Sequence, residues 1–193
     1  MASLRNDKWI KRMCLLKHMI EPFVDHQVDN ENGEPVLSYG LSSFGYDIRL
    51  GSKFRMINQK LDKTGVIDPK HIDPCLFASY DAKVFELPPF SYVLGESFET
   101  FNIPDDIFVI LLGKSTLARA GIILNVTPGE PDWSGKWTVE IFNATPCVVR
   151  LYAGEGIGQA TFWRGKTPNV SYGDRGGKYQ NQPGVILPLM RAQ

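Results

Sequence analysis

The 193-residue sequence has few cysteines and no excess of either charge, and these shortages exclude several functions. Lys plus Arg and Asp plus Glu both number 21, so the formal net charge of zero argues against a general nucleic-acid or membrane-surface binder. The three cysteines never form a CxxC pair, which predicts free thiols in a reducing compartment. There is no signal core, and no run approaches ~20 apolar residues, so neither secretion nor membrane spanning is indicated. We therefore expect a cytoplasmic protein that binds neither nucleic acid nor membranes.

Several catalytic motifs are also missing. The three histidines, His18, His26 and His71, form no ligand cluster with a cysteine pair, and the H-x-E and P-C-x-x-C signature of zinc nucleobase deaminases is absent. Gly113-Lys114-Ser115-Thr116 resembles the end of a phosphate-binding P-loop, but Phe108 stands where that loop needs its first glycine. No G-x-S-x-G element is present. Zinc hydrolases, P-loop ATPases and serine hydrolases are therefore disfavoured.

The pattern of apolar residues indicates one mainly β domain over residues 1–193. Residues Ser3–Met19 have helical periodicity, with Ser3 or Asn6 as the N-cap. Residues Asn58–Ala82 predict a loop with short strands. Short β segments separated by Pro and Gly favour a sandwich or barrel over βαβ units. These segments are Lys83–Leu87, Ser91–Gly95, Asp106–Leu112, Pro146–Tyr152 and Gly156–Trp163.

Three local features of the first third carry further expectations. The polar residues Asp25–Pro35 predict an exposed loop, and Gly51-Ser52 predicts a turn. Between them, Asp47 and Arg49 alternate with apolar residues along a predicted strand and therefore share one face. A structural ion pair between these two side chains is favoured over a catalytic role.

The stretch from Gly113 to Asn143 contains the most informative carboxylate. Trp137, Val139 and Ile141 share one face of a predicted strand, and Glu140 lies between them on the other face. One interpretation is an exposed Glu on an edge strand. The alternative is a buried carboxylate, which needs partners because burying a charge alone is costly.

The segment Ser115–Arg119 offers such partners. If it forms one helical turn, Ser115 and Arg119 lie four residues apart on one side and present a hydroxyl and a guanidinium to Glu140. This set suits the activation of a water molecule. We expect Lys114, Ser115 and Arg119 to hold anionic and polar groups, with Glu140 transferring protons.

The C-terminal tail, residues 171–193, differs in composition from the rest of the chain. It combines Gly173, Gly176 and Gly177 with a dense set of donor side chains and then an apolar segment, Val185–Pro188. One interpretation is a frayed terminus. The other, favoured by the apolar ending, is a tail that docks and closes over an anion.

Several blocks of the chain, taken together, resemble the dCTP deaminase family of the dCTP deaminase/dUTPase superfamily. The central blocks are Gly-Lys-Ser-Thr-x-Ala-Arg, Asn-Val-Thr-Pro-x-Glu-Pro-x-Trp and Val-Glu-Ile-Phe-Asn. Further blocks occur in family order along nearly the whole chain: Trp9-Ile10, Ile20–Phe23, Ser38–Gly40, Gly45–Arg49, Gly156–Gln159 and Asp174–Gln180.

The resemblance implies a distorted, jelly-roll-like (dUTPase-like) β-barrel with an N-terminal helix and short helical turns, assembled as a homotrimer with nucleotide sites between subunits. It implies zinc-independent hydrolysis of dCTP to dUTP and ammonia, which supplies dUTP for dUMP and dTTP synthesis, with Mg²⁺ bound through the triphosphate. Alternatives within this resemblance are a bifunctional enzyme that releases dUMP, a plain dUTPase, or a non-catalytic nucleotide-binding trimer.

The resemblance also implies roles for individual residues. Glu140 is the expected general acid and base, with Ser115 and Arg119 as its catalytic partners. A glycine at position 129, where relatives often carry a larger apolar residue, is expected to loosen its loop. The implied substrate-binding residues are Lys114, Ser115, Thr116, Leu117, Ala118, Arg119, Thr138, Val139, Glu140, Gln159, Tyr172, Lys178 and Gln182.

Overall fold

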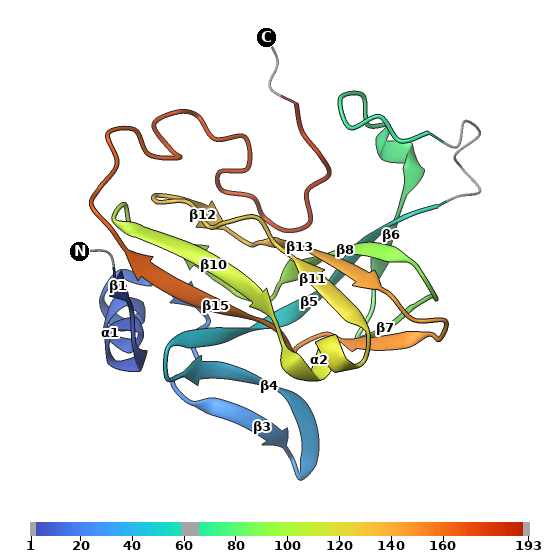
Figure 1. Ribbon diagram of the computed structural model, residues 1–193, viewed down its shortest axis with the longest axis horizontal. Helices are drawn as coiled ribbons and strands as arrows, with labels where there is room; N and C mark the ends of the chain where they lie inside the picture. The colour runs from blue at the N-terminus through green and yellow to red at the C-terminus, as the bar shows by residue number, and fades with distance from the viewer. Residues whose placement is uncertain (1–2, 59–65, 191–193) are drawn as a thin grey trace.

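The computed structural model describes residues 3–58 and 66–190, and strands dominate it (Figure 1). None of the helices in this part of the chain is long and apolar enough to cross a membrane. The helices are α1 (Asp7–Lys17), the short 3₁₀ helix η1 (Pro74–Leu76) and α2 (Ser115–Arg119). The strands are β1 (Ser3–Leu4), β2 (Ile20–Glu21), β3 (Gln27–Glu31), β4 (Glu34–Ser42), β5 (Gly45–Ile57), β6 (Phe77–Asp81), β7 (Val84–Leu87), β8 (Tyr92–Ser97), β9 (Thr100–Asn102), β10 (Ile107–Gly113), β11 (Ile122–Asn125), β12 (Ser134–Gly135), β13 (Thr138–Asn143), β14 (Val149–Tyr152) and β15 (Gly156–Arg164).

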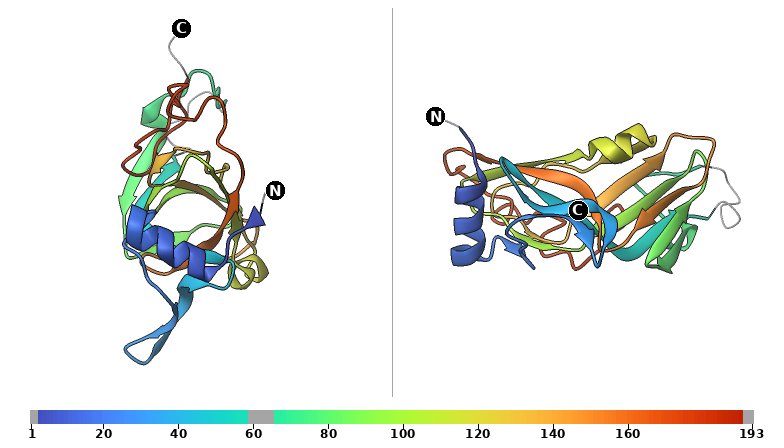
Figure 2. Two further views of the ribbon diagram at one scale, coloured as in Figure 1. Left: turned by 90° about the vertical axis from the view of Figure 1, so that its left-hand side faces the viewer. Right: turned by 90° about the horizontal axis from the view of Figure 1, so that it is seen from below.

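The largest sheet curls around the core. It runs in the order β1-β15-β5-β8-β13-β11, with β10 added to β15, β4 and β6 added to β5, and β3 added to β4. Two smaller sheets, β12-β9-β2 and β14-β7, complete the wall. Figure 2 shows α1 across one end of the curled sheet, where Ile10 and Cys14 are buried. The predicted mainly β, jelly-roll-like fold with an N-terminal helix is thus confirmed.

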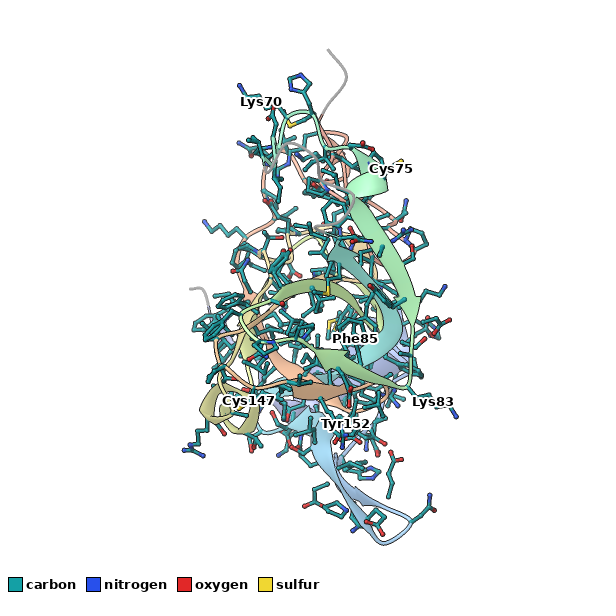
Figure 3. All side chains as sticks on the ribbon, turned by 90° about the vertical axis from the view of Figure 1, so that its right-hand side faces the viewer. Lys70, Cys75, Lys83, Phe85, Cys147 and Tyr152 are labelled. Atoms are coloured by element: carbon teal, nitrogen blue, oxygen red, sulfur yellow. The ribbon has the colours of Figure 1, made fainter. Side chains whose placement is uncertain are left out.

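Aromatic rings fill the inside of the curled sheet. Phe85 lies within the ring of strands in Figure 3 and stacks on Phe54, with 4.5 Å between the ring centroids. At the other side of the core Trp137 packs on Phe101, at 4.0 Å between centroids. Cys75 and Cys147 are exposed, and no cysteine forms a disulfide, as predicted.

The N-terminal helix is shorter than predicted. It begins at Asp7 rather than Ser3, because the Asn6 side chain accepts a hydrogen bond from Trp9 N and so caps the first turn. Residues 3–4 instead form β1, paired with Trp163 and Arg164 of β15. The helix ends at Lys17 because His18 adopts a left-handed conformation.

The predicted loop at Asp25–Pro35 is wrong over most of its length. β3 and β4 form a hairpin, with Glu31 opposite Glu34 and only Asn32-Gly33 between them. Both turn residues have positive φ, 53° and 89°, as a type I′ turn requires. The Asn-Gly pair was therefore a readable hairpin signal. Residues 59–65 of the other predicted loop, Asn58–Ala82, lie outside the described residues, and β6 is a short strand near the end of that loop.

The turn predicted at Gly51-Ser52 is also wrong, since β5 continues through it to Ile57. A side chain at Gly51 would place its Cβ 2.5 Å from Cγ of Glu96, on the neighbouring strand β8. The pairing between β5 and β8 is irregular here. The glycine therefore permits close approach of a side chain within a strand and does not end the strand.

The predicted pair between Asp47 and Arg49 does not form. Arg49 Nε instead lies 2.8 Å from Oε1 of Glu99, whose side chain is wholly buried, and the Arg49 guanidinium lies between two aromatic rings, Tyr39 and Phe98. Asp47 pairs with Lys114. Asp47 and Arg49 are two residues apart on one strand and were therefore expected to pair, but in the folded chain each pairs with a residue distant in the sequence.

We predict that Glu99→Ala lowers the free energy of unfolding by about 3–5 kcal/mol, because it leaves the Arg49 charge buried without its partner. Glu86→Ala is the matched control, since it removes the exposed ion pair with Arg150 and is expected to cost less than about 1 kcal/mol. The double variant Arg49→Met/Glu99→Leu should be more stable than Glu99→Ala. Urea denaturation measures all three, and equal losses for the two Glu→Ala variants would contradict the buried-pair interpretation.

Candidate functional site

Glu140 lies in the middle of β13, on the face that points away from the core. Val139 and Ile141 are wholly buried, whereas Glu140 is partly exposed, so the predicted alternation is confirmed. β13 is paired on both sides, with Leu94 of β8 and Asn125 of β11 opposite Glu140. The strand is therefore not an edge strand, and the simple exposed-edge interpretation of this carboxylate is wrong.

The surroundings of Glu140 favour its protonated form. Burial raises the pKa of Glu140 to about 7, although a main-chain hydrogen bond and the Asn125 side chain both act to lower it. The Asn125 bond runs from Nδ2 to Oε2 of Glu140 at 3.2 Å. A carboxyl group with a pKa near neutrality gains and loses protons readily, as a general acid and base must.

A cavity of about 740 Å³ opens beside Glu140, and its walls come from distant parts of the chain. Apolar side chains of β5, β6, β8 and the segment before η1 form one wall, including Ile57, Phe77 and Leu94. The C-terminal tail forms another. The polar side chains that line the cavity include Tyr92, Thr138, Tyr172, Lys178 and Gln182.

The C-terminal tail is docked on the protein, where Figure 1 shows it passing above β12 and β13, and its Tyr172, Lys178 and Gln182 line this cavity. Gln182 forms a parallel bridge with Gly135, so the tail lies alongside the short strand β12. Trp133 Nε1 donates to Tyr179 O at 2.9 Å, and Thr138 Oγ1 accepts from Ile186 N at 3.1 Å. The docked tail is therefore confirmed for residues up to 190, and the frayed alternative is wrong.

A second polar cluster lies at the start of α2. Lys114 Nζ pairs with Oδ2 of Asp47, while Gln159 Nε2 donates to Oδ1 of Asp47 at 2.9 Å. Both side chains of the Lys114–Asp47 pair are largely buried. The predicted helical turn Ser115–Arg119 is confirmed as α2, whose Ser115 and Arg119 are exposed. Leu117, in the middle of the same helix, is buried.

The predicted site residues thus fall into two sets within one chain. Thr138, Glu140, Tyr172, Lys178 and Gln182 line the cavity. The other set comprises Lys114, the α2 residues and Gln159, and no described contact joins it to Glu140. The Val139 side chain points into the core, so only its main chain is available to a ligand.

Sequence comparison decides the family. A family model described as dCTP deaminase-like matches residues 4–165. A protein of Chloroflexus aggregans called dCTP deaminase is 47% identical over 186 residues, or 96% of this chain and 97% of that one. A second, from Herpetosiphon aurantiacus, is 49% identical over 187 residues, covering 96% and 98%. The chain belongs to the dCTP deaminase-like family.

A solved structure shares the fold. The 2'-deoxycytidine 5'-triphosphate deaminase of Agrobacterium tumefaciens superposes with a TM-score of 0.61 over 85% of this chain, at 17% identity. This chain covers 48% of the length of that protein. At that identity the match concerns the architecture of this dCTP deaminase-like chain and not the details of its site.

Sequence reasoning missed several residues beside Glu140 in this dCTP deaminase-like chain. Asn125 was readable in principle, because β11 and β13 are antiparallel neighbours and their register places it opposite Glu140. Glu130 lines the cavity and pairs with Arg175 at 2.7 Å, which joins the loop before β12 to the tail. Tyr92 reaches the cavity from β8, and burial together with the Glu140 charge raises the pKa of Tyr92 to about 12.

Gly129 does not loosen its loop as expected. Its N–H donates to Val109 O at 2.9 Å, and its carbonyl accepts from Val109 N at 2.8 Å. A Cβ at this position would lie 2.8 Å from Trp137 Cζ2 and 2.9 Å from Val109 Cβ. The loop is thus fixed by two hydrogen bonds, and the Trp137 ring occupies the space that a side chain would need.

We predict that Thr138→Val loosens the tail, because it removes the acceptor for Ile186 N while keeping a β-branched side chain on β13. Thr138→Ser is the matched control, since it keeps the hydroxyl. Hydrogen exchange of residues 182–188 should speed up in the Val variant and stay near the wild-type rate in the Ser variant. Equal protection in all three proteins would show that this bond does not hold the tail.

Proposed function

We propose that the protein is a dCTP deaminase, which hydrolyses dCTP to dUTP and ammonia. The observation that carries this proposal is the half-buried Glu140, whose pKa of about 7 suits a proton-transfer group, beside a closable cavity. The relatives called dCTP deaminase support the choice of substrate. The proposed unit is one domain over residues 1–193 whose tail, residues 171–193, closes over the nucleotide.

In the proposed reaction, water attacks C4 of the cytosine ring while Glu140 takes one of its protons. Glu140 then gives that proton to the ring nitrogen, and the amino group leaves as ammonia after a further proton transfer. A well-placed general base contributes about 10²–10⁴ to the rate. In the assembly proposed below, Ser115 and Arg119 of the neighbouring subunit orient the water and stabilise the oxyanion, and that guanidinium favours the ionised form of Glu140 against the effect of burial.

The substrate-binding roles are assigned by position. Thr138 and the main chain of Val139 lie next to Glu140, at the place proposed for the base. Tyr172, Lys178 and Gln182, from the tail, are proposed to meet the deoxyribose and phosphates, because Lys178 brings a positive charge to that part of the cavity. Lys114, residues 115–119 and Gln159 form the complementary set proposed for the same nucleotide.

We propose that a homotrimer joins the two sets. β10 exposes a row of apolar side chains, Phe108, Ile110 and Leu112, which a monomer would leave in water. The Lys114–Asp47 cluster lies directly after this row. In a closed ring each interface joins two different surfaces, so α2 of one subunit can meet Glu140 of the next.

We propose that Mg²⁺ enters with the substrate and that zinc is not required. Among residues 3–58 and 66–190, no three His, Cys, Asp or Glu side chains form a cluster that could hold a metal ion. Each histidine there is exposed and paired with one carboxylate, as in His18–Glu21 and His71–Asp68. Mg²⁺ is commonly bound by substrate phosphates with few protein ligands, which fits this donor set. The proposed place of action is the cytoplasm, where dUTP feeds dUMP and dTTP synthesis.

We predict that Glu140→Gln binds dCTP but loses turnover, with a fall in kcat of at least about 10²–10⁴, because the amide can neither accept nor return the proton. Glu86→Gln, at an exposed strand position, is the control and should keep full activity. Chromatography of dCTP incubated with Mg²⁺ resolves the products: dUTP with ammonia supports the proposal, dUMP with pyrophosphate indicates a bifunctional enzyme, and no product indicates a binding protein.

A mixing experiment tests the shared site. Arg119→Ala and Glu140→Gln are each expected to be inactive, because each removes one catalytic group from every interface. Co-assembly of the two variants should restore activity at about a quarter of the interfaces, those that pair an intact α2 with an intact Glu140. Activity is measured beside the mass of the assembly in solution. A mixture that forms mixed trimers but stays inactive would contradict a site built from two subunits.

A further inference from the structure

Asn125 is the side chain that the structure places directly on the Glu140 carboxylate. It is the last residue of β11, and the antiparallel register puts it opposite Glu140 of β13. Its Nδ2 donates to Oε2 of Glu140 at 3.2 Å. In the described part of the chain, Glu140 receives a hydrogen bond from no other side chain. The two oxygens of the carboxylate are therefore not equivalent.

The position of Asn125 is fixed by the backbone, which makes this contact reproducible. β11 pairs with β13 from Ile122 to Asn125, and Ala144 N donates to Gly121 O at 2.9 Å beyond the other end of the ladder. A short amide at the end of a paired strand has few conformations that reach the neighbouring strand. The bond thus follows from strand register and does not depend on the C-terminal tail.

We propose that Asn125 is a positioning residue for the reaction, holding Oε2 of Glu140 so that Oε1 is the oxygen that takes the proton of the attacking water. The inference rests on the proposed deaminase activity and adds a role that acts through Glu140. As the water O–H bond breaks and the oxygen bonds to C4, the proton passes to Oε1 and from there to the ring nitrogen. Asn125 itself neither gains nor loses a proton.

A neutral amide donor suits this role. A hydrogen bond to the carboxylate stabilises its ionised form, which the base needs before water attacks. The Asn125 amide is one of the groups that keep the pKa of Glu140 from rising further under the effect of burial. The titratable groups that face the same cavity are Tyr92 from β8, Glu130 from the loop before β12, and Tyr172, Lys178 and Tyr179 from the tail. In the proposed trimer Arg119 of the next subunit joins them.

Three substitutions separate positioning from simple structural support. Asn125→Ala removes the donor, Asn125→Asp replaces it with a second carboxylate, and Asn125→His restores an N–H at a similar distance from the backbone. Asn102→Ala is the matched control, because the Asn102 side chain also donates one bond, to His18 O at 2.8 Å, but lies on β9. Wild type and Glu140→Gln are assayed alongside.

The readout is the pH dependence of kcat/KM for dCTP deamination, with kcat and KM measured separately. In Asn125→Ala, kcat should fall about 10- to 100-fold with a smaller change in KM. In the same variant, the acidic limb of the kcat/KM profile should move to higher pH, because the ionised form of Glu140 has lost a hydrogen-bond donor. In Asn125→Asp this limb should move further, because a like charge is added beside Glu140. Asn125→His should return the limb toward the wild-type position, and Asn102→Ala should leave it unchanged.

The outcomes distinguish this inference from the function on which it rests. A wild-type protein that releases no ammonia from dCTP, or an active Glu140→Gln variant, would overturn the proposed function. With the wild type active and Glu140→Gln inactive, an acidic limb that stays in place in Asn125→Ala overturns the positioning role, even if kcat falls. If Asn125→Ala fails to fold, the Asp and His variants decide the same question, because the limb should move to higher pH in Asn125→Asp and stay near the wild-type position in Asn125→His.

Discussion

A carboxylate held halfway between water and the protein interior is the constraint on which this structure depends. The side chains of Val139 and Ile141 on β13 point into the core. Because side chains alternate along a strand, Glu140 lies on the opposite face. There the tail and the apolar wall of the cavity remove part of its hydration, and the pKa of Glu140 rises to about 7. A fully exposed carboxylate would be a weak base, and a fully buried one would remain protonated; the strand places Glu140 between these limits.

The polar residues proposed to bind the nucleotide form two separate sets in the folded chain. The cavity set depends on β13 and the tail, which the bonds of Thr138, Trp133 and Gln182 hold together. The α2 set is fixed separately, through the largely buried pair of Lys114 with Asp47 and the support of Gln159. Each set is held by its own contacts, and the homotrimer proposed above would join the two sets without a rearrangement of either.

Local patterns in the sequence predicted what depends on neighbours along the chain. The period of two in β13 and the helical turn at Ser115–Arg119 were both readable, because strand and helix geometry fix which side chains share a face. The Asn32-Gly33 turn was equally readable from the sequence, although the prediction there was an exposed loop. Family blocks added the likeness to deaminases, which no single motif carried.

Partners far apart in the sequence could not be predicted in this way. Arg49 pairs with Glu99, 50 residues away, and Lys114 with Asp47, 67 residues away. Nothing near Asp47 or Arg49 indicates those partners, since the pairing is decided when distant strands come together. The same holds for the cavity, whose walls come from β5, β8, β13 and the tail. The sequence around Glu140 predicted the face of the strand on which this carboxylate lies, but not the surroundings that set its pKa.

The contact between Gly129 and Trp137 has an evolutionary consequence. A methyl group at position 129 would overlap the indole ring at 137, and overpacking of this kind typically costs about 1–3 kcal/mol. A Cβ at position 129 would also lie 2.9 Å from Val109 Cβ, so both neighbours must give way before position 129 can accept a larger residue. Position 129 is therefore epistatic with positions 109 and 137, and descendants of this chain are expected to gain bulk at 129 only together with changes at those positions.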